Sequence, residues 1–195
     1  MKKVCLLILL LCAVSLFAAE ENEILIFPEP GCDVGDLKWG MTVEEVQARL
    51  GKKLVYRGSE DSVSIYTFES KLYGSNTEVS FIFLCEKLIY TTMHIRLYGE
   101  KCERRDTFFR VLIAQSREKI GKEIQMGHLF SVSIKIRELY SNLGIDSFIP
   151  DGFDLEERAA RSELCMWKTQ KGYMCIALDN SVLGSIEITF FSNKI

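Results

Sequence analysis

The sequence predicts an α+β fold in which helices pack on an antiparallel sheet in two layers, built as a tandem duplication. Three features of the 195-residue chain support this prediction. A helix-start signature at Thr42 precedes segments in which apolar and polar residues alternate, and short turns join those segments. A faint repeat also relates the two halves of the chain at an offset of 93 residues.

The first 19 residues have the three parts of a secretory signal peptide. Lys2 and Lys3 are basic, residues 4–17 are an apolar run, and Ala18 and Ala19 are small. The run is shorter than the roughly 20 apolar residues that a membrane-spanning helix needs. We therefore expect cleavage near Ala19 and a periplasmic or secreted protein of the bacterial envelope.

Two alternatives to a cleaved signal are an uncleaved interfacial anchor and a lipid anchor. Lipidation is the less favoured reading, because three leucines precede Cys12 where a small residue is usual. No transmembrane segment is expected after residue 19. Loss of Lys2 and Lys3 would change the formal charge from −3 to −5, which argues against nucleic acid as a partner because polyanions select basic surfaces.

The rest of the chain divides into four expected segments. In order, these are an extended leader over 20–36, a first α+β unit over 37–100, a connecting helix over 101–127 and a second α+β unit over 128–195. The leader is expected because prolines and glycines occur there among acidic residues. About 176 residues remain after the signal, which suits one ordinary domain or two small ones.

The first expected helix begins after Thr42. The sequence Thr-Val-Glu-Glu is a capping box, in which the Thr42 hydroxyl accepts from the Glu45 backbone and the Glu45 carboxylate accepts from the Thr42 backbone. Met41 and Val46 are placed to form a hydrophobic staple, and Gly51 is a natural C-cap. The pattern predicts a short helix that ends at Leu50.

Alternation predicts strands in both units. In the first unit they are a strand at 64–69 and a hairpin of 79–85 with 89–97, in which Ile89, Thr91, Met93, Ile95 and Leu97 share the face towards the helices. In the second unit they cover 164–169, 173–178 and 185–192. A helix over 106–120 with an apolar stripe connects the units. Residues 130–140 fit either a strand or a helix.

The repeat aligns corresponding elements of the two units. At an offset of 93, Gly51 falls on Gly144 at the end of a helix. In the strands, the same offset aligns Met93 with Ile186, Ile95 with Ile188 and Leu97 with Phe190. A shared offset at both ends of a unit is harder to obtain by chance than either match alone.

Residues 37–51, LKWGMTVEEVQARLG, resemble the small outer-membrane-assembly lipoproteins and the tandem-repeat β-lactamase inhibitor proteins of bacteria. The shared pattern is an apolar-Gly-Met-Thr start, an acidic-acidic-Val helix and a Leu-Gly end. The resemblance implies helices packed on an antiparallel sheet, and a protein that acts by binding other proteins without chemistry of its own.

The sequence offers little for catalysis. Its two histidines are His94 and His128, and neither has cysteine or carboxylate neighbours at metal-ligand spacing. There is no CxxC, HExxH or phosphate-binding glycine motif. We expect no enzyme, no metal and no cofactor. A cysteine nucleophile paired with either histidine remains the basis of one alternative, an extracytoplasmic hydrolase.

The cysteines after residue 19 are Cys32, Cys85, Cys102, Cys165 and Cys175, an odd number. Cys165 and Cys175 flank a turn at 170–172, and a hairpin with a three-residue loop would place them face to face. They therefore form either a disulfide or two buried thiols that behave as small apolar residues.

The sheet face opposite the helices is the candidate binding surface. Its expected residues are Tyr90, Thr92, His94, Arg96, Tyr98, Glu187, Thr189 and Phe191. Tyrosine and arginine beside small polar residues are typical of protein interfaces. We expect a non-enzymatic module that binds a protein partner through this exposed face or the groove between units. The alternatives are a carrier of a small apolar ligand, a solvated face, and a face buried between the two units.

Overall fold

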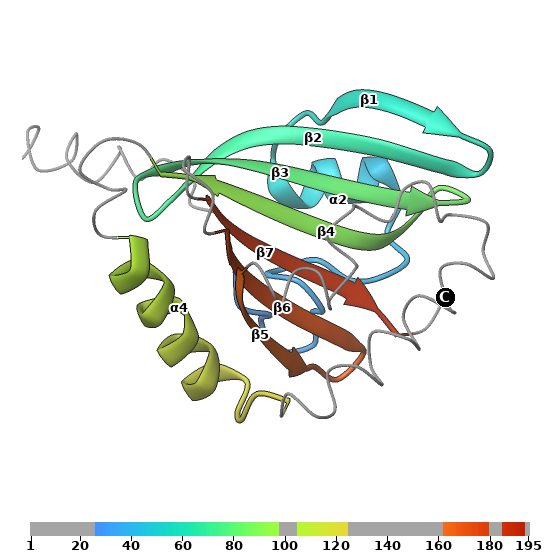
Figure 1. The fold of residues 1–195 in the computed structure, drawn as a ribbon. Coiled ribbons are helices and arrows are strands. Elements are labelled where there is room, and N and C mark those ends of the chain that lie inside the picture. The colour runs from blue at the N-terminus through green and yellow to red at the C-terminus, as the bar shows by residue number, and fades with distance from the viewer. Residues whose placement is uncertain (1–25, 98–104, 125–161, 180–184, 194–195) are drawn as a thin grey trace, which may run out of the picture.

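The computed structural model describes residues 26–97, 105–124, 162–179 and 185–193, shown in colour in Figure 1. These residues form a mixed α+β fold, which confirms the predicted class. The elements in chain order are α2 (Val43–Leu50), β1 (Val55–Glu60), β2 (Val63–Leu72), β3 (Ser75–Leu84), β4 (Lys87–Arg96), α4 (Arg105–Lys119), β5 (Ser162–Lys168), β6 (Gly172–Asp179) and β7 (Ser185–Ser192).

Several predictions concern residues outside these ranges. They are the signal peptide at 1–19, Tyr98, Cys102, His128 and the choice between helix and strand at 130–140. In the described part of the chain, no helix is long and apolar enough to cross a membrane.

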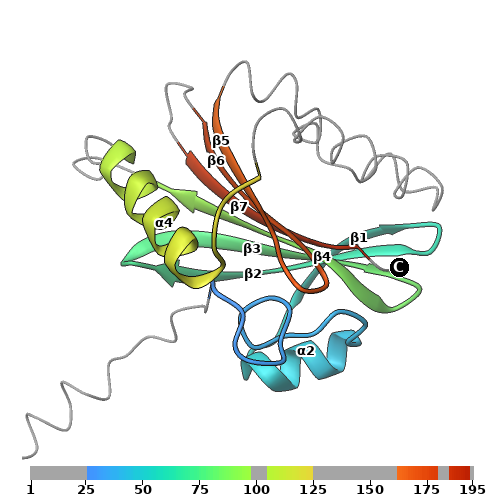
Figure 2. The ribbon, with the colours of Figure 1, turned by 90° about the horizontal axis from the view of Figure 1, so that it is seen from below.

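One antiparallel sheet contains all seven described strands, in the order β1-β2-β3-β4-β7-β6-β5. β4 from the first half of the chain pairs with β7 from the second half, so both halves share the sheet. Figure 2 shows the strong twist of the sheet, in which β5, β6 and β7 run steeply relative to β2, β3 and β4.

The helix α2 forms where its capping signals predict it. The Thr42 backbone N–H donates to Glu45 Oε2 at 2.7 Å, and the Glu45 backbone N–H donates to Thr42 Oγ1 at 3.3 Å. Gly51 ends the helix with φ 62°, a left-handed conformation that glycine adopts without a Cβ clash. Val46 is fully buried and fixes the orientation of the helix on the sheet.

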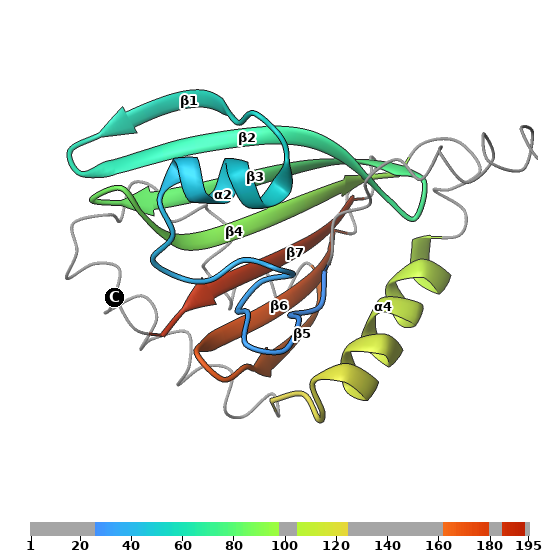
Figure 3. The same cartoon turned by 180° about the vertical axis from the view of Figure 1, so that it is seen from behind.

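Both described helices pack against one side of the sheet, which we call the first face. Its apolar cluster joins Val46 of α2 and Leu112 of α4 to inward residues of the strands. The strand residues include Phe68, Val79, Phe81, Phe83, Met93, Ile95, Trp167, Met174, Ile176, Ile186, Ile188 and Phe190. Figure 3 shows α2 and the segment before it in front of the sheet on this side.

The connecting helix α4 also contacts the β2–β3 hairpin. The rings of Tyr73 and Phe108 meet edge to face at 5.3 Å between centroids, and the Tyr73 hydroxyl donates to Gln115 Oε1 at 2.8 Å. Phe109 and Leu112 are buried, as the apolar stripe at 106–120 predicts. These contacts fix the helix at one end of the sheet.

After α4 the chain passes around the outer edge of β5. The indole N–H of Trp167 donates to the Gly121 carbonyl at 3.1 Å on the first face. The Ile124 backbone N–H then donates to the Met166 carbonyl at 2.8 Å, and the Ile124 side chain packs on the opposite side of the sheet. Residues 121–124 therefore cover part of this edge.

The expected leader is packed onto the sheet in its described part, which corrects the prediction of an extended segment. Ile26 and Val34 belong to the first-face cluster and are nearly inaccessible to solvent. Gly40 N donates to the Leu88 carbonyl at 2.9 Å, and Leu88 N donates to the Met41 carbonyl at 2.8 Å. Burial of Ile26 and Val34 outweighs the flexibility that the nearby glycines give to the chain.

A β-bulge in β4 overturns the predicted position of Ile89. Ile82 pairs with Tyr90 and Phe83 pairs with Leu88, so Ile89 is an extra residue between them. Leu88 takes the place on the first face, whereas Ile89 packs in the cluster on the opposite side. The alternation pattern does not predict a bulge, because the side chains before and after the extra residue follow the alternation in different phases.

Candidate functional site

The candidate site lies on the side of the sheet opposite α2 and α4, which we call the second face. The sequence placed the outward residues of β4 and β7 on a common face, and the β4–β7 register sets them directly opposite one another. The cross-strand pairs are Tyr90 with Phe191, Thr92 with Thr189 and His94 with Glu187. The second face thus changes along the strands from aromatic to hydroxyl to charged side chains.

The aromatic end of the second face is part of an apolar cluster. Tyr90 and Phe191 are almost fully buried, and Phe191 stacks on Tyr173 with 5.5 Å between ring centroids. Ile82 and Met166 pack in the same cluster. This end of the face therefore contributes to the stability of the sheet through apolar burial.

The middle of the face is a network of hydroxyl groups around one carboxylate. Thr189 Oγ1 donates to Glu187 Oε1 at 3.0 Å, and Thr92 Oγ1 donates to the same oxygen at 3.4 Å. The Glu187 side chain is only 10% exposed. A buried carboxylate is costly unless hydrogen bonds compensate it, and the two hydroxyls do so here.

The other end of the face is charged and partly open to solvent. His94 Nε2 lies 3.9 Å from Glu187 Oε2, and Arg96 Nη2 donates to Glu78 Oε2 at 3.2 Å. The side chains of His94 and Arg96 are 42% and 49% exposed. We call Glu78, His94 and Arg96 the charged corner.

The expectation of an open binding face is wrong for most of its residues. The buried members of the expected set are Tyr90, Thr92, Glu187, Thr189 and Phe191. The central strands carry apolar side chains on both faces, a pattern typical of strands buried on both sides. Of the expected set, His94 and Arg96 do reach solvent, and Tyr98 lies outside the described residues.

The proposed disulfide is also overturned, because the hairpin register differs by one residue from the expected one. Cys165 pairs with Ile176 and Cys175 pairs with Met166. A shift of one residue turns a side chain to the other face of a strand. Cys165 therefore packs on the first face and Cys175 on the second, and no disulfide joins them.

The arrangement at Glu187 does not have the order of groups that nucleophilic catalysis requires. A nucleophilic hydroxyl must give its proton to a base such as histidine. Here the hydroxyls of Thr92 and Thr189 donate to Glu187, and His94 faces the other oxygen of the same carboxylate. Among the described residues, no three His, Cys, Asp or Glu side chains are grouped to hold a metal ion.

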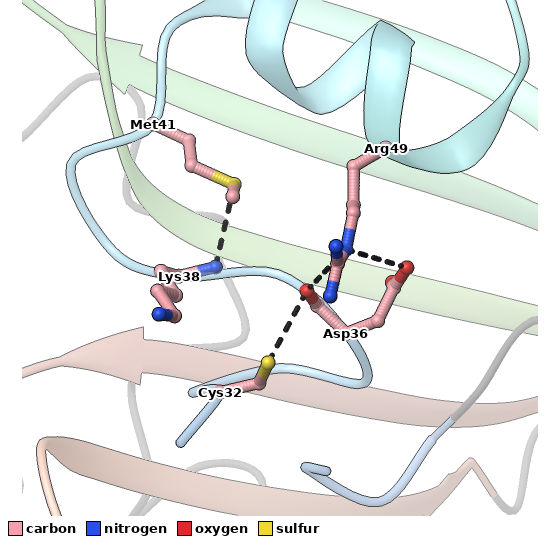
Figure 4. Close-up of polar contacts among 5 residues, drawn as sticks. All are labelled: Cys32, Asp36, Lys38, Met41 and Arg49. Atoms are coloured by element: carbon pink, nitrogen blue, oxygen red, sulfur yellow. Dashed lines mark hydrogen bonds and ion pairs between the residues drawn. The ribbon is translucent and has the colours of Figure 1, made fainter. Parts of the chain in front are cut away.

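A second polar cluster, missed by the sequence reasoning, joins α2 to the segment before it (Figure 4). Arg49 Nε donates to the Asp36 carbonyl at 3.2 Å and lies 3.3 Å from Asp36 Oδ2. The Cys32 thiol donates to the same carbonyl at 3.3 Å, and Lys38 N donates to Met41 Sδ at 3.5 Å. These contacts hold a loop in place, and they give the Cys32 thiol a structural role.

No protein-family model, curated protein or solved structure matches the chain. The resemblance of residues 37–51 to envelope lipoproteins and inhibitor proteins therefore stays a prediction.

Proposed function

We propose that the protein is an exported, non-enzymatic binding module that contacts a protein partner through the charged corner. The observation that supports this most directly is the gradient along the second face. Its aromatic and hydroxyl parts are buried, whereas His94 and Arg96 remain about half exposed at one end. The contact surface is thus smaller than the whole-face surface expected from the sequence.

The pairing of the groups supports binding over catalysis. The carboxylate of Glu187 accepts hydrogen bonds from both threonine hydroxyls, and its other oxygen lies 3.9 Å from His94 Nε2. Glu78 accepts a hydrogen bond from Arg96 at 3.2 Å. Each of these two exposed side chains therefore lies beside a carboxylate on the neighbouring strand, which reduces the entropy lost when a partner binds.

The partner is expected to present a surface with both charges. Arg96 offers several donors in a planar fork that suits a carboxylate, and arginine is enriched at the energetic centre of interfaces. Glu78 is partly exposed and is able to accept from a basic residue of the partner. Such a contact gives specificity and association rate more than affinity, so binding should weaken with salt.

The test is site-specific photo-crosslinking in cells that produce the protein. The crosslinker replaces Asn76, which is exposed and precedes Glu78 by two residues on β3, so the corner itself stays intact. The matched control carries it at exposed Glu44 on α2. An adduct at position 76 that Arg96→Ala reduces, with none at position 44, supports the proposal. Equal labelling at both positions, or labelling unaffected by Arg96→Ala, would reject it.

Export follows from the signal peptide expected at 1–19 and has a separate test. Mass spectrometry of the protein from an envelope extract should give a chain that begins at Glu20. A chain that retains Met1 and stays in the cytoplasm would contradict the export part of the proposal alone.

We also propose that the fold is a two-layer tandem duplication. The offset of 93 residues aligns His94 with Glu187, and these two residues lie opposite each other in the β4–β7 pair. If a two-fold axis relates β4 to β7, it passes between two residues that are both equivalent in the repeat and paired in the sheet, as His94 and Glu187 are. The register of the sheet thus agrees with the internal repeat, although the repeat was derived from sequence alone.

A further inference from the structure

His94 stands in a row of ionisable side chains that crosses four neighbouring strands of the second face. Glu69 of β2 pairs with Glu78 of β3. Glu78 also pairs with His94 of β4, and His94 pairs in turn with Glu187 of β7. Residues paired directly across antiparallel strands project from the same face of the sheet. The imidazole therefore has a carboxylate-bearing residue on the strand at either side, and a third lies one strand farther away.

The basic groups of this region are the ones most open to solvent. The side chains of His94 and Arg96 are 42% and 49% exposed, whereas those of Glu78 and Glu187 are 28% and 10% exposed. Glu187 accepts from two threonine hydroxyls, and Glu78 accepts from Arg96. The carboxylates are thus engaged within the sheet. A partner that approaches the charged corner meets the basic groups first, so an anionic group is complementary to them.

The charge of this surface depends on pH through His94. Histidine is the side chain that ordinarily changes its charge between about pH 5 and pH 8, whereas arginine keeps its charge throughout. On the described strands beside His94, the charged residues that face it are Glu78 and Glu187, and Arg96 follows two residues later on its own strand. With a neutral imidazole, Arg96 is the one cation among these groups, and the carboxylates disfavour an anion. Protonation of His94 adds a second cation on the exposed side.

We propose that the charged corner binds an acidic segment of its protein partner, and that protonation of His94 strengthens this binding as the pH falls below neutral. The inference rests on the proposed function, because it assigns the chemistry of the partner and a regulation to the same surface. A guanidinium has five N–H donors, so the hydrogen bond from Arg96 to Glu78 leaves donors for a carboxylate of the partner. The imidazolium of His94 then contacts the same acidic segment.

The size of the expected effect follows from the exposure of the site. One added pair of opposite charges about 4 Å apart in water changes an equilibrium constant roughly fivefold. The side chain of His94 is partly in water, so we expect this factor. Binding should therefore become roughly fivefold tighter between about pH 7.5 and about pH 5.5, a range that spans the ordinary titration of histidine.

Photo-crosslinking at two pH values tests the proposal. Purified protein that carries the crosslinker in place of Asn76 is irradiated with an envelope extract of the producing cells, and the protein concentration that gives half-maximal adduct is measured. This concentration should fall roughly fivefold at the acidic pH. His94→Gln stays neutral and should lose the change, whereas His94→Lys stays charged and should bind tightly at both pH values. His128→Gln, which replaces the other histidine of the sequence, is the matched control and should respond as the wild type does.

The comparison between variants separates His94 from the titration of the partner, because the partner is the same in every reaction. Mass spectrometry of the adduct should place the crosslink in a segment rich in Asp and Glu. A pH response that His94→Gln keeps or that His128→Gln removes, or a crosslink in a basic segment, would overturn the proposal. An adduct that depends on Arg96 but not on pH removes this inference and leaves the proposed function in place. The absence of an adduct at both pH values rejects the two together.

Discussion

Lys171 Nζ, at the tip of the β5–β6 hairpin, lies 3.5 Å from Asp33 Oδ2 in the segment before α2. The Asp33 side chain is 4% exposed, and the same oxygen accepts from the Trp39 backbone N–H at 3.0 Å. Two parts of the chain that are distant in sequence are thus joined through one buried carboxylate. This contact holds the N-terminal segment on the first face.

Replacing Asp33 should therefore be costly. Asp33→Ala is expected to lower the free energy of unfolding by about 2–3 kcal/mol, because the Trp39 N–H loses its acceptor within the protein. Lys171→Ala should cost less than about 1 kcal/mol, because half of the lysine side chain is in water, where the ion pair is screened. Urea unfolding curves measure both. Lys168→Ala on the same hairpin is the control. Equal effects of Asp33→Ala and Lys168→Ala would contradict the anchoring role.

The network at Glu187 gives a second prediction. Glu187→Ala should destabilise the protein by about 1–3 kcal/mol, because the buried hydroxyls of Thr92 and Thr189 lose their acceptor. Glu187→Gln keeps an acceptor oxygen and should cost less than Glu187→Ala. Chemical unfolding with Glu69→Gln as the exposed control on β2 measures the difference. A Glu187→Ala variant as stable as the control would show that the network adds no stability.

The sequence predicts the helices and strands of this fold from local signals, but it does not predict that the second face of the sheet is buried. The Thr42 capping box, Gly51 and the alternation at Met93 and Ile188 predict elements that the structure has, because each depends on neighbouring residues alone. β1 was missed because its sequence, VYRGSE, lacks alternation and contains a glycine at a bulge. Whether Thr92 or Glu187 is open to water depends on distant parts of the chain, and alternation cannot reveal it.

In the candidate site too, features that depend on neighbouring residues were predicted, and features that depend on distant residues were not. The outward parity of β4 and β7 was read correctly from the sequence, and the register then brought His94 beside Glu187. The ion pair of Arg96 with Glu78 was not foreseen, because Glu78 precedes the predicted strand at 79–85. The one-residue difference in the register of the β5–β6 hairpin could not be predicted either, because the register depends on the length of the loop.

Two glycines on the sheet provide a prediction with a matched control. A Cβ at Gly172 would lie 2.1 Å from the Phe191 carbonyl oxygen, a backbone atom that cannot move aside. Gly172→Ala should cost about 3 kcal/mol or more, because the β6–β7 pairing must shift. A Cβ at Gly58 meets nothing within 4 Å, so Gly58→Ala should be nearly neutral. Thermal unfolding compares them. A Gly172→Ala protein with the melting temperature of Gly58→Ala would refute the close approach.

The turn that carries the chain around β5 should respond to pH. The Arg117 guanidinium donates to the Glu123 carboxylate, with Nε to Oε2 at 2.9 Å, and this hydrogen bond lowers the pKa of Glu123 below its ordinary value. A lowered folded-state pKa means that the stabilisation is present above the pKa of the unfolded chain. It is lost as the pH falls through the lower, folded-state pKa.

The loss of stabilisation should be local, because Arg117 is exposed, Glu123 is partly exposed and the ion pair is screened by water. Its nearest reporter is the Trp167 indole N–H, which donates to Gly121 in the same turn. Hydrogen exchange of this indole proton, followed by NMR from neutral pH into the acidic range, should accelerate beyond the intrinsic trend as Glu123 is protonated. Glu123→Gln should show the faster exchange already at neutral pH and no further acid step. An acid step that persists in Glu123→Gln would assign the effect to another carboxylate.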